Sequence, residues 1–367
     1  MTELAFQVET HPTTSRAKGA RPKPRVWLAG SFAAMAAPGG GETQLVSLAR
    51  ALRETGVDAR LWRPWEDDWR EVDCLHLVGS QREHLPIARL AKARGVAVVV
   101  STVAWFDLRS YWDEPRKLIG RLSACARYAA RAVCPRLPSW RRELYHLADR
   151  LLPNSKAEAR QLARLFGVPA ERITVVPNGA DPRFATVTHD EFLARTGLRE
   201  FVLYAGRIEP RKNQLGFLRA MRGARVPIVV MGDAVPGSEW YAALCRREAD
   251  SSVRFIPRID HDSTLLSSAY AAASCVALAS RFETPGLVAL EAGMTGMPLV
   301  LPEVGAAREY FGDMARYVRH DDAAGIRRAV MAAHVSPRDP RLATLVRDNY
   351  SWQAVAKATR GVYAAVV

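Results

Sequence analysis

Short apolar runs alternate with amphipathic stretches along almost the whole chain, and few folds accept such a pattern. In the first half the apolar runs are VWLAGSF, ARLWRP, CLHLVGS and VAVVVS, and helical spacing appears between them, as in LPIARLAKARG. Runs that are apolar on both faces and alternate with helices are typical of a parallel sheet covered by helices on both sides. This half therefore predicts a doubly wound α/β domain.

The alternation of apolar runs and helical stretches continues through RLLPNS, the helical stretch KAEARQLARLFG and the strand-like ITVVP. A second series of strand-like and helical stretches starts at FVLYAG. The chain has 367 residues, enough for two domains of about 150 to 200 residues each. We predict α/β domains at 25–185 and 186–350, a basic tail at 1–24, and a helix at 351–367 that packs back on the first domain. Ligands bind beyond the carboxyl ends of the strands in such sheets, so the cleft between the domains is the expected site.

The charge of +14 comes from 52 Lys and Arg against 38 Asp and Glu, and it indicates an anionic partner such as a phosphorylated molecule, an anionic lipid or nucleic acid. Ten of the cations lie in segment 109–150, together with several aromatic residues. We expect basic helices there, which suit an anionic membrane surface. Five scattered cysteines without a CxxC pair argue against disulfides or zinc and for the cytoplasm.

Glycines at 39, 40 and 41 lie between a predicted strand and helix, where backbone N–H groups can approach a phosphate. Gln44 stands where the dinucleotide pattern GxGxxG needs its last glycine, which removes the main support for a nicotinamide or flavin site. A tight turn without a ligand remains an alternative for this loop.

Two further segments carry charged residues at predicted strand ends. YAGRIEPRKNQ places Arg207 and Lys212 where two cations suit a diphosphate, with a solvated surface cluster as the alternative. In SRFETPGLVALEAG, Glu283 precedes a turn and Glu291 lies in the helix that begins near Gly286. Carboxylates can hold the hydroxyls of a sugar and a ribose, while the helix N-terminus between them faces phosphates. This pattern favours a nucleoside diphosphate sugar over a merely structural role for Glu291.

Residues 26 to 363 resemble a GT-B retaining glycosyltransferase of the large group 1 (family 4) class, marked by Glu, seven residues, Glu. The resemblance is carried by GGGETQLVSLARAL, VVPNGAD, YAGRIEPRKNQ, VRFIPRI and FETPGLVALEAG in the family's order. It implies two Rossmann-like domains facing a cleft. It also implies that Arg207 and Lys212 bind the donor diphosphate, Glu283 the sugar and Glu291 the ribose. The remaining binding residues it implies are Thr284, Gly286, Leu287, Ile259, Gly39, Gly40 and Gly41.

One departure from the family is the segment Val103, Ala104, Trp105, where members often carry a histidine. Asp107 beyond it is a candidate contact for the acceptor, and His76 is expected to be a structural strand residue.

The implied activity is retaining transfer of a hexose from a nucleotide sugar to a hydroxyl of a glycan, a lipid-linked acceptor or a small molecule. No cofactor or metal is expected, since Arg207, Lys212 and the helix dipole would neutralise the leaving diphosphate. Two other classes stay open: a nucleotide-sugar epimerase or phosphorylase, and a non-catalytic module that binds sugar nucleotides or nucleic acid. Nucleic acid is the less favoured partner. The expected location is the cytoplasm, at the inner face of the membrane.

Overall fold

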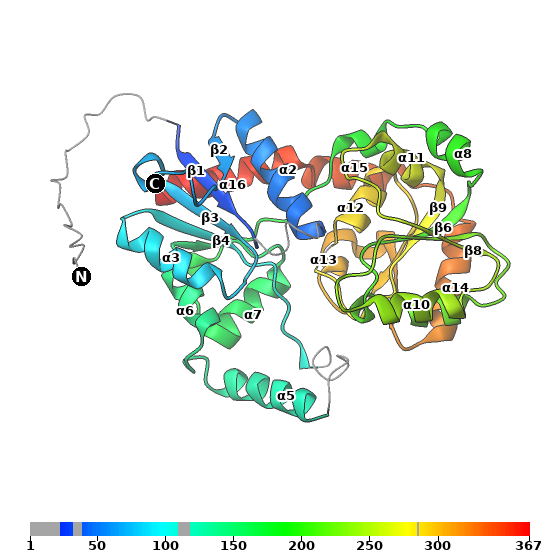
Figure 1. Ribbon diagram of the computed structural model, residues 1–367, viewed down its shortest axis with the longest axis horizontal. Coiled ribbons are helices and arrows are strands. Elements are labelled where there is room, and N and C mark those ends of the chain that lie inside the picture. Colours follow the sequence, from blue (N-terminus) through cyan, green and yellow to red (C-terminus); the bar gives the residue numbers. More distant parts are fainter. Residues whose placement is uncertain (1–22, 32–38, 109–117, 285) are drawn as a thin grey trace, which may run out of the picture.

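The computed structural model describes residues 23–31, 39–108, 118–284 and 286–367, and folds them into two α/β lobes (Figure 1). The predicted tail at 1–24 lies outside these residues except for its last two positions. The first lobe has a parallel sheet of order β2-β1-β3-β4-β5. Its strands are β1 (Arg25–Ala29), β2 (Asp58–Leu61), β3 (Cys74–Val78), β4 (Ala97–Ser101) and β5 (Arg150–Leu151). Its helices are α2 (Gly40–Glu54), α3 (His84–Ala93), α5 (Leu118–Val133), α6 (Trp140–Leu147) and α7 (Lys156–Phe166).

The second lobe has a six-stranded parallel sheet of order β11-β10-β9-β6-β7-β8. Its strands are β6 (Phe201–Ala205), β7 (Ile228–Met231), β8 (Val253–Ile256), β9 (Ala273–Ala277), β10 (Leu299–Pro302) and β11 (Ala315–Val318). Its helices are α8 (Asp190–Thr196), α9 (Gln214–Met221), α10 (Glu239–Glu248), α11 (Thr264–Ala272), α12 (Leu287–Met294), α13 (Ala307–Phe311), α14 (Ala323–His334) and α15 (Pro340–Asn349). In both sheets the strand order reverses beside the first strand, so the predicted doubly wound fold class is confirmed.

The last helix, α16 (Trp352–Val366), leaves the second lobe and packs against α2 of the first (Figure 1). Trp352, Val355 and Tyr363 belong to the same buried cluster as residues of β1 and α2. The hydroxyl of Tyr363 lies 2.6 Å from Nδ1 of His76, and Nε2 of that ring lies 2.9 Å from Oγ of Ser101. Burial lowers the pKa of His76 to about 3, so the ring is a neutral part of the core of the first lobe.

One domain boundary and one strand differ from the sequence-based expectation. The core of the second lobe already includes Ala180 and Phe184, so that lobe begins several residues before the expected boundary at 185. The strand expected at ITVVP is wrong, because only Ile173 pairs, in an isolated bridge with Leu151. The N–H of Val176 still donates to the carbonyl of Pro153 at 2.9 Å, but Pro153 has no N–H to donate in return, so no regular strand forms beyond the bridge.

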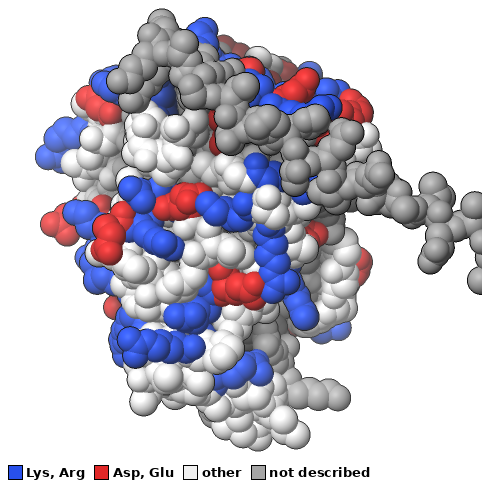
Figure 2. Space-filling model, turned by 90° about the vertical axis from the view of Figure 1, so that its left-hand side faces the viewer, with Lys and Arg blue, Asp and Glu red and all other residues white. Residues whose placement is uncertain are grey.

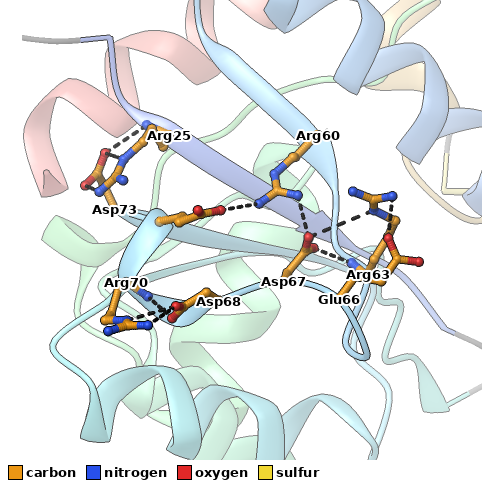
Figure 3. A network of polar contacts seen from close by, with 9 residues as sticks. Arg25, Arg60, Arg63, Glu66, Asp67, Asp68, Arg70 and Asp73 are labelled. Atoms are coloured by element: carbon orange, nitrogen blue, oxygen red, sulfur yellow. Dashed lines mark hydrogen bonds and ion pairs between the residues drawn. The ribbon is translucent and has the colours of Figure 1, made fainter.

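Several ion pairs join strands β1 and β2 of the first sheet to the segment that connects β2 to β3 (Figure 3). Arg25 and Asp73 tie the amino ends of β1 and β3 together at 2.9 Å. Asp67 is almost fully buried, pairs with Arg60 and accepts from the backbone N–H of Arg63 at 2.6 Å. The network fixes the outer part of this lobe and leaves the carboxyl strand ends open toward the other lobe.

Candidate donor site between the lobes

A cavity of about 370 Å³ lies between the lobes, where loops from both meet. The first lobe contributes the start of α2, and the second contributes the carboxyl ends of β6, β7 and β8 together with the start of α12. Of the residues predicted from the sequence, the cavity is lined by Gly39, Gly40, Arg207, Ile259, Leu287 and Glu291. Parallel strand ends and a helix N-terminus thus meet in one place, as expected for a site that binds an anion.

Close backbone approaches shape this wall. Gly232 has φ +144°, and a Cβ at this position would lie only 2.1 Å from the carbonyl oxygen of Gly206. Gly305 has φ +124°, and its Cβ would lie 1.9 Å from the carbonyl oxygen of Glu283, with which it forms an isolated bridge. Neither position accepts a side chain, so the loop at Gly232 packs directly against the backbone of Gly206, and the loop at Gly305 packs directly against the backbone of Glu283.

Lys212 and Glu283 form a buried ion pair beside the cavity. Nζ of Lys212 lies 2.5 Å from Oε1 of Glu283, which also accepts from Oγ of Ser280 at 2.7 Å. Burial by itself raises the pKa of Glu283, but the charges of Lys212 and Arg211, with the hydrogen bonds from Lys212 and Ser280, together outweigh burial and hold that pKa below its usual value. Glu283 is therefore a carboxylate at neutral pH and cannot donate a proton.

Glu291 is also buried, and both of its oxygens are held. Nε2 of His261 lies 3.0 Å from Oε1, and the hydroxyl of Tyr270 donates to Oε2 at 2.6 Å. Burial, and then the charge of Glu291, raise the pKa of Tyr270 well above 10, so the hydroxyl keeps its proton. Each carboxylate oxygen has a second lone pair, which leaves Glu291 able to accept from hydroxyls of a ligand.

A polar chain connects Glu291 to the first lobe. Nη2 of Arg183 lies 3.3 Å from Nδ1 of His261, and a guanidinium can only donate, so Nδ1 accepts and Nε2–H donates to Glu291. Asp262 lies 3.5 Å from Arg183 and 3.0 Å from Arg50 of α2. Glu291 is therefore linked to the first lobe through His261, Arg183, Asp262 and Arg50.

The comparisons with known proteins match this arrangement lobe by lobe. Residues 199–334 match the family model described as "Glycosyl transferases group 1", and residues 59–179 match the one described as "Glycosyl transferase 4-like domain". The chain is 30% identical to a glycogen synthase of Mycobacterium tuberculosis over 327 residues, which cover 86% of this chain and 72% of that protein. The chain belongs to the group 1 glycosyl transferases. It is also 26% identical to a D-inositol 3-phosphate glycosyltransferase of Xylanimonas cellulosilytica, over 89% of this chain and 91% of that one.

Solved structures show that this glycosyltransferase has the GT-B fold. The sucrose-phosphate synthase of Thermosynechococcus elongatus superposes with a TM-score of 0.72 at 16% identity, over 93% of this chain and 98% of that one. Anabaena HepE, solved in complex with UDP and glucose, gives a TM-score of 0.63 at 17% identity, over 94% of this chain and 98% of that one.

The remaining predicted residues of the glycosyltransferase do not line the main cavity. Gly286 caps α12, and its Cβ position is 3.3 Å from Oε2 of Glu283. Gly41 lines a smaller neighbouring cavity of about 80 Å³. Thr284 and the partly exposed Asp107 line neither of these two cavities. The acceptor role expected for Asp107 therefore stays a prediction.

The segment that lacks the family's histidine, 103–105, is held in position by hydrogen bonds that it and Thr102 donate to the buried carboxyl group of Glu158. Val103 has φ +42°, a strained conformation for a β-branched residue, and it lines the smaller cavity. Oε1 of Glu158 accepts from Oγ1 of Thr102 at 2.5 Å and from the N–H of Ala104 at 2.6 Å. Burial raises the pKa of Glu158 to about 7 despite these donors. Glu158 thus fixes the strained turn on both sides of Val103.

Sequence reasoning missed the partners of the two predicted carboxylates, namely His261, Tyr270 and Ser280, as well as Glu158. His261 follows the predicted strand VRFIPRI closely, and a polar residue just beyond a strand end is the one signal that could have indicated it. Among the described residues, no three His, Cys, Asp or Glu side chains gather as a metal site requires, and no helix is both long and apolar enough to cross a bilayer.

Proposed function

We propose that this glycosyltransferase moves a hexose from a nucleotide sugar to a hydroxyl group, with retention at the anomeric carbon. The observation that carries this proposal is the cavity between the lobes, in which Arg207, the start of α12 and Glu291 face the glycine loop of the other lobe. A cation and a helix N-terminus suit a diphosphate, and a buried carboxylate with free lone pairs suits a diol. The presence of UDP and glucose in HepE supports a nucleotide-linked donor.

The roles proposed for the other residues follow from their positions. Arg207 and the N–H groups at Leu287 bind the diphosphate, Glu291 the ribose hydroxyls, and Ile259 lies against the base. Glu283 binds the transferred sugar, and Lys212 both orients Glu283 and adds positive charge near the diphosphate. Gly39 and Gly40 cover the donor from the first lobe.

For the reaction we propose substitution on one face of the sugar. The acceptor oxygen bonds to the anomeric carbon as the bond to the leaving phosphate oxygen breaks, and that phosphate oxygen takes the acceptor's proton. Glu283 is held ionised by Lys212, so it stabilises positive charge on the sugar and does not act as an acid. Arg207, Lys212 and the α12 dipole supply positive charge for the leaving diphosphate, and we propose that no metal is needed.

We also propose that the enzyme works in the cytoplasm, at the inner face of the membrane, on a glycan or lipid-linked acceptor. The support is the charge of segment 118–142, which holds six arginines and no Asp or Glu. Such a segment is attracted to anionic lipid head groups.

A pair of isosteric variants tests the assignment of the two carboxylates. Glu291→Gln is expected to weaken nucleoside diphosphate binding about tenfold or more, because the acceptor for the ribose loses its charge. Glu283→Gln is expected to reduce turnover while nucleotide affinity is nearly kept. Calorimetric titration with UDP, GDP and ADP measures the first effect, and release of nucleotide from a panel of sugar donors measures the second.

The anomeric configuration of the product, read by NMR, tests retention. An inverted product overturns the mechanism. Nucleotide binding without any turnover would favour a non-catalytic binding module, and equal effects of both variants on both quantities would mean that the two roles are misassigned.

A further inference from the structure

The helix α5 of the first lobe carries an apolar stripe that is exposed. The exposed fractions are 60% for Leu118, 81% for Ile119, 50% for Leu122 and 87% for Val133. Three alanines of the same helix, at 126, 129 and 130, are exposed as well. These positions recur at spacings of three and four residues, so they form a single side of the helix.

The opposite side of α5 faces the protein. Ala124 is the buried residue of this helix, and Tyr128 and Ala132 pack against the core of the first lobe. The guanidinium of Arg131 lies 5.2 Å above the ring of Phe166 in α7. The stripe therefore points away from the molecule, and Figure 1 shows α5 at the outer end of the first lobe, beyond α6 and α7. A soluble helix normally turns its apolar side to the core, so this reversed arrangement calls for an apolar partner.

The charge around the stripe indicates what that partner is. From Leu118 to Arg142 the chain has arginines at 121, 127, 131, 136, 141 and 142, and no acidic residue. Figure 2 shows a mainly white lower end of the molecule, with Lys and Arg side chains just above it. An apolar face bordered by cations is the pattern of a helix that lies in the interface of an anionic membrane.

We propose that α5 docks on the surface of a bilayer that contains anionic lipid. Leu118, Ile119, Leu122 and Val133 enter the boundary between head groups and acyl chains, and exposed arginines such as Arg127 and Arg136 contact the lipid phosphates. This inference rests on the proposed function in one respect, the location at the inner face of the membrane. It adds that α5 is the element that contacts the membrane. It does not depend on the chemistry of the donor cavity.

Sedimentation with vesicles tests the proposal on the full chain. The protein is expected to pellet with phosphatidylcholine vesicles that contain about one third phosphatidylglycerol, and about tenfold less with phosphatidylcholine alone. Raised salt is expected to release it. Replacing Leu118, Ile119 and Val133 with serine is expected to lower binding about tenfold, because the apolar contribution is lost. Nucleotide affinity should be unchanged, since these side chains are exposed and none of them lines the cavity.

Charge reversal tests the second half of the interaction. Arg127→Glu and Arg121→Glu together are expected to weaken binding to anionic vesicles about tenfold or more and to leave weak binding to neutral vesicles unaffected. Arg116 and Lys117 also belong to the basic segment 109–150, but they lie outside the described residues.

The matched control is Val335→Ser together with Trp65→Ser, which remove equally exposed apolar side chains elsewhere on the surface. The control should bind vesicles as the parent does. The proposal is overturned if the stripe variant also binds as the parent does, if the control loses as much, or if sedimentation velocity shows that the stripe instead joins two copies of the chain. Vesicle binding without transfer activity would count against the proposed function and leave the docking helix standing.

Discussion

At the scale of single residues, Arg207 and Lys212 differ although the sequence presents them as two equivalent cations. Arg207 is 45% exposed and lines the cavity, whereas Lys212 is buried against Glu283. Arg207→Ala is expected to cost about 1.5 to 3 kcal/mol of nucleoside diphosphate binding, the value of a charge-assisted contact, with little change in the free energy of unfolding. Calorimetric titration and urea unfolding of the same samples measure both quantities.

Lys212→Ala should behave differently, because it leaves the carboxylate of Glu283 buried without its cation. We expect a loss of about 3 to 5 kcal/mol of stability, most of which a second change, Glu283→Gln, restores. Arg347→Ala, which removes an exposed ion pair with Asp348, serves as the control for both cations. If Arg207→Ala and Arg347→Ala bind the nucleotide equally well, the diphosphate assignment is incorrect.

Glu158 gives the protein a pH dependence of stability with a defined sign. Its pKa is raised from 4.5 to about 7 by burial, so between these values the folded protein keeps a proton that the unfolded chain has lost. The free energy of unfolding therefore falls as pH rises through this window, by about 3 kcal/mol at most, and stays level above it.

Glu158→Gln should remove this slope, because glutamine does not titrate. Urea unfolding at a series of pH values from below 4.5 to above 7 measures it, with the exposed Glu171→Gln as the control. An unchanged slope in Glu158→Gln would show that the carboxyl group is ionised throughout the window.

The carboxylates of the site could be predicted from the sequence, but their partners could not. Glu283 and Glu291 lie in one short segment whose turn and helix are recognisable locally. Lys212 lies 71 positions before Glu283, and His261 lies 30 before Glu291. Such contacts are decided by how the strands are ordered in the sheet, which local spacing does not contain.

At the scale of elements, the sequence predicts the strands that are buried on both faces but misses the edge strand β11. β4 and β6 are buried along their whole length and stand out as continuous apolar runs. β11 has the sequence ARYV with only Val318 buried, so no apolar run identifies it. Beside the other sheet, the apolar pattern of ITVVP predicts a strand where the structure has only an isolated bridge at Ile173.

The helix α16 is an element of the first lobe although it follows the second lobe in sequence. Tyr363→Phe removes the hydroxyl that contacts Nδ1 of His76, and is expected to destabilise the first lobe by about 1 to 3 kcal/mol, the cost of an unmet buried polar group. Hydrogen exchange should show faster opening of β3, with β6 unaffected.

Tyr317→Phe is the matched control, since its hydroxyl donates to the carbonyl of Gly312 at the surface of the second lobe. Equal protection of β3 in the parent and in Tyr363→Phe would mean that α16 does not support this strand.

At the scale of the whole molecule, the two lobes are joined by buried as well as exposed contacts. Glu309 accepts from the N–H groups of Lys156 and Ala157 at the start of α7, at 2.6 and 3.1 Å. The buried hydroxyl of Tyr310 donates to the carbonyl of Asn154 at 2.5 Å and accepts from the N–H of Asn178 at 3.0 Å. The second lobe therefore caps a helix of the first.

These contacts predict that the lobes unfold together. Replacing Glu309 with alanine and Tyr310 with phenylalanine removes several hydrogen bonds worth about 0.5 to 1.5 kcal/mol each. Differential scanning calorimetry is expected to show one transition for the parent and two for the double variant. Arg50→Ala, which breaks only an exposed pair with Asp262, should keep the single transition. A single, unshifted transition in the double variant would contradict the coupling.

The return of α16 to the first lobe has a consequence for how the protein is made. His76 and its partner Tyr363 are 287 residues apart, and ribosomes add about 5 to 20 residues per second. Roughly 15 to 60 s therefore pass between the synthesis of β3 and the synthesis of α16, the helix that contacts it through Tyr363. The core residues of the second lobe span only Ala180 to Val346, so this lobe meets its own core partners after a shorter delay. The half synthesised first is thus the half that finishes last, and during translation its uncovered apolar face is the part of the nascent chain that most needs a chaperone.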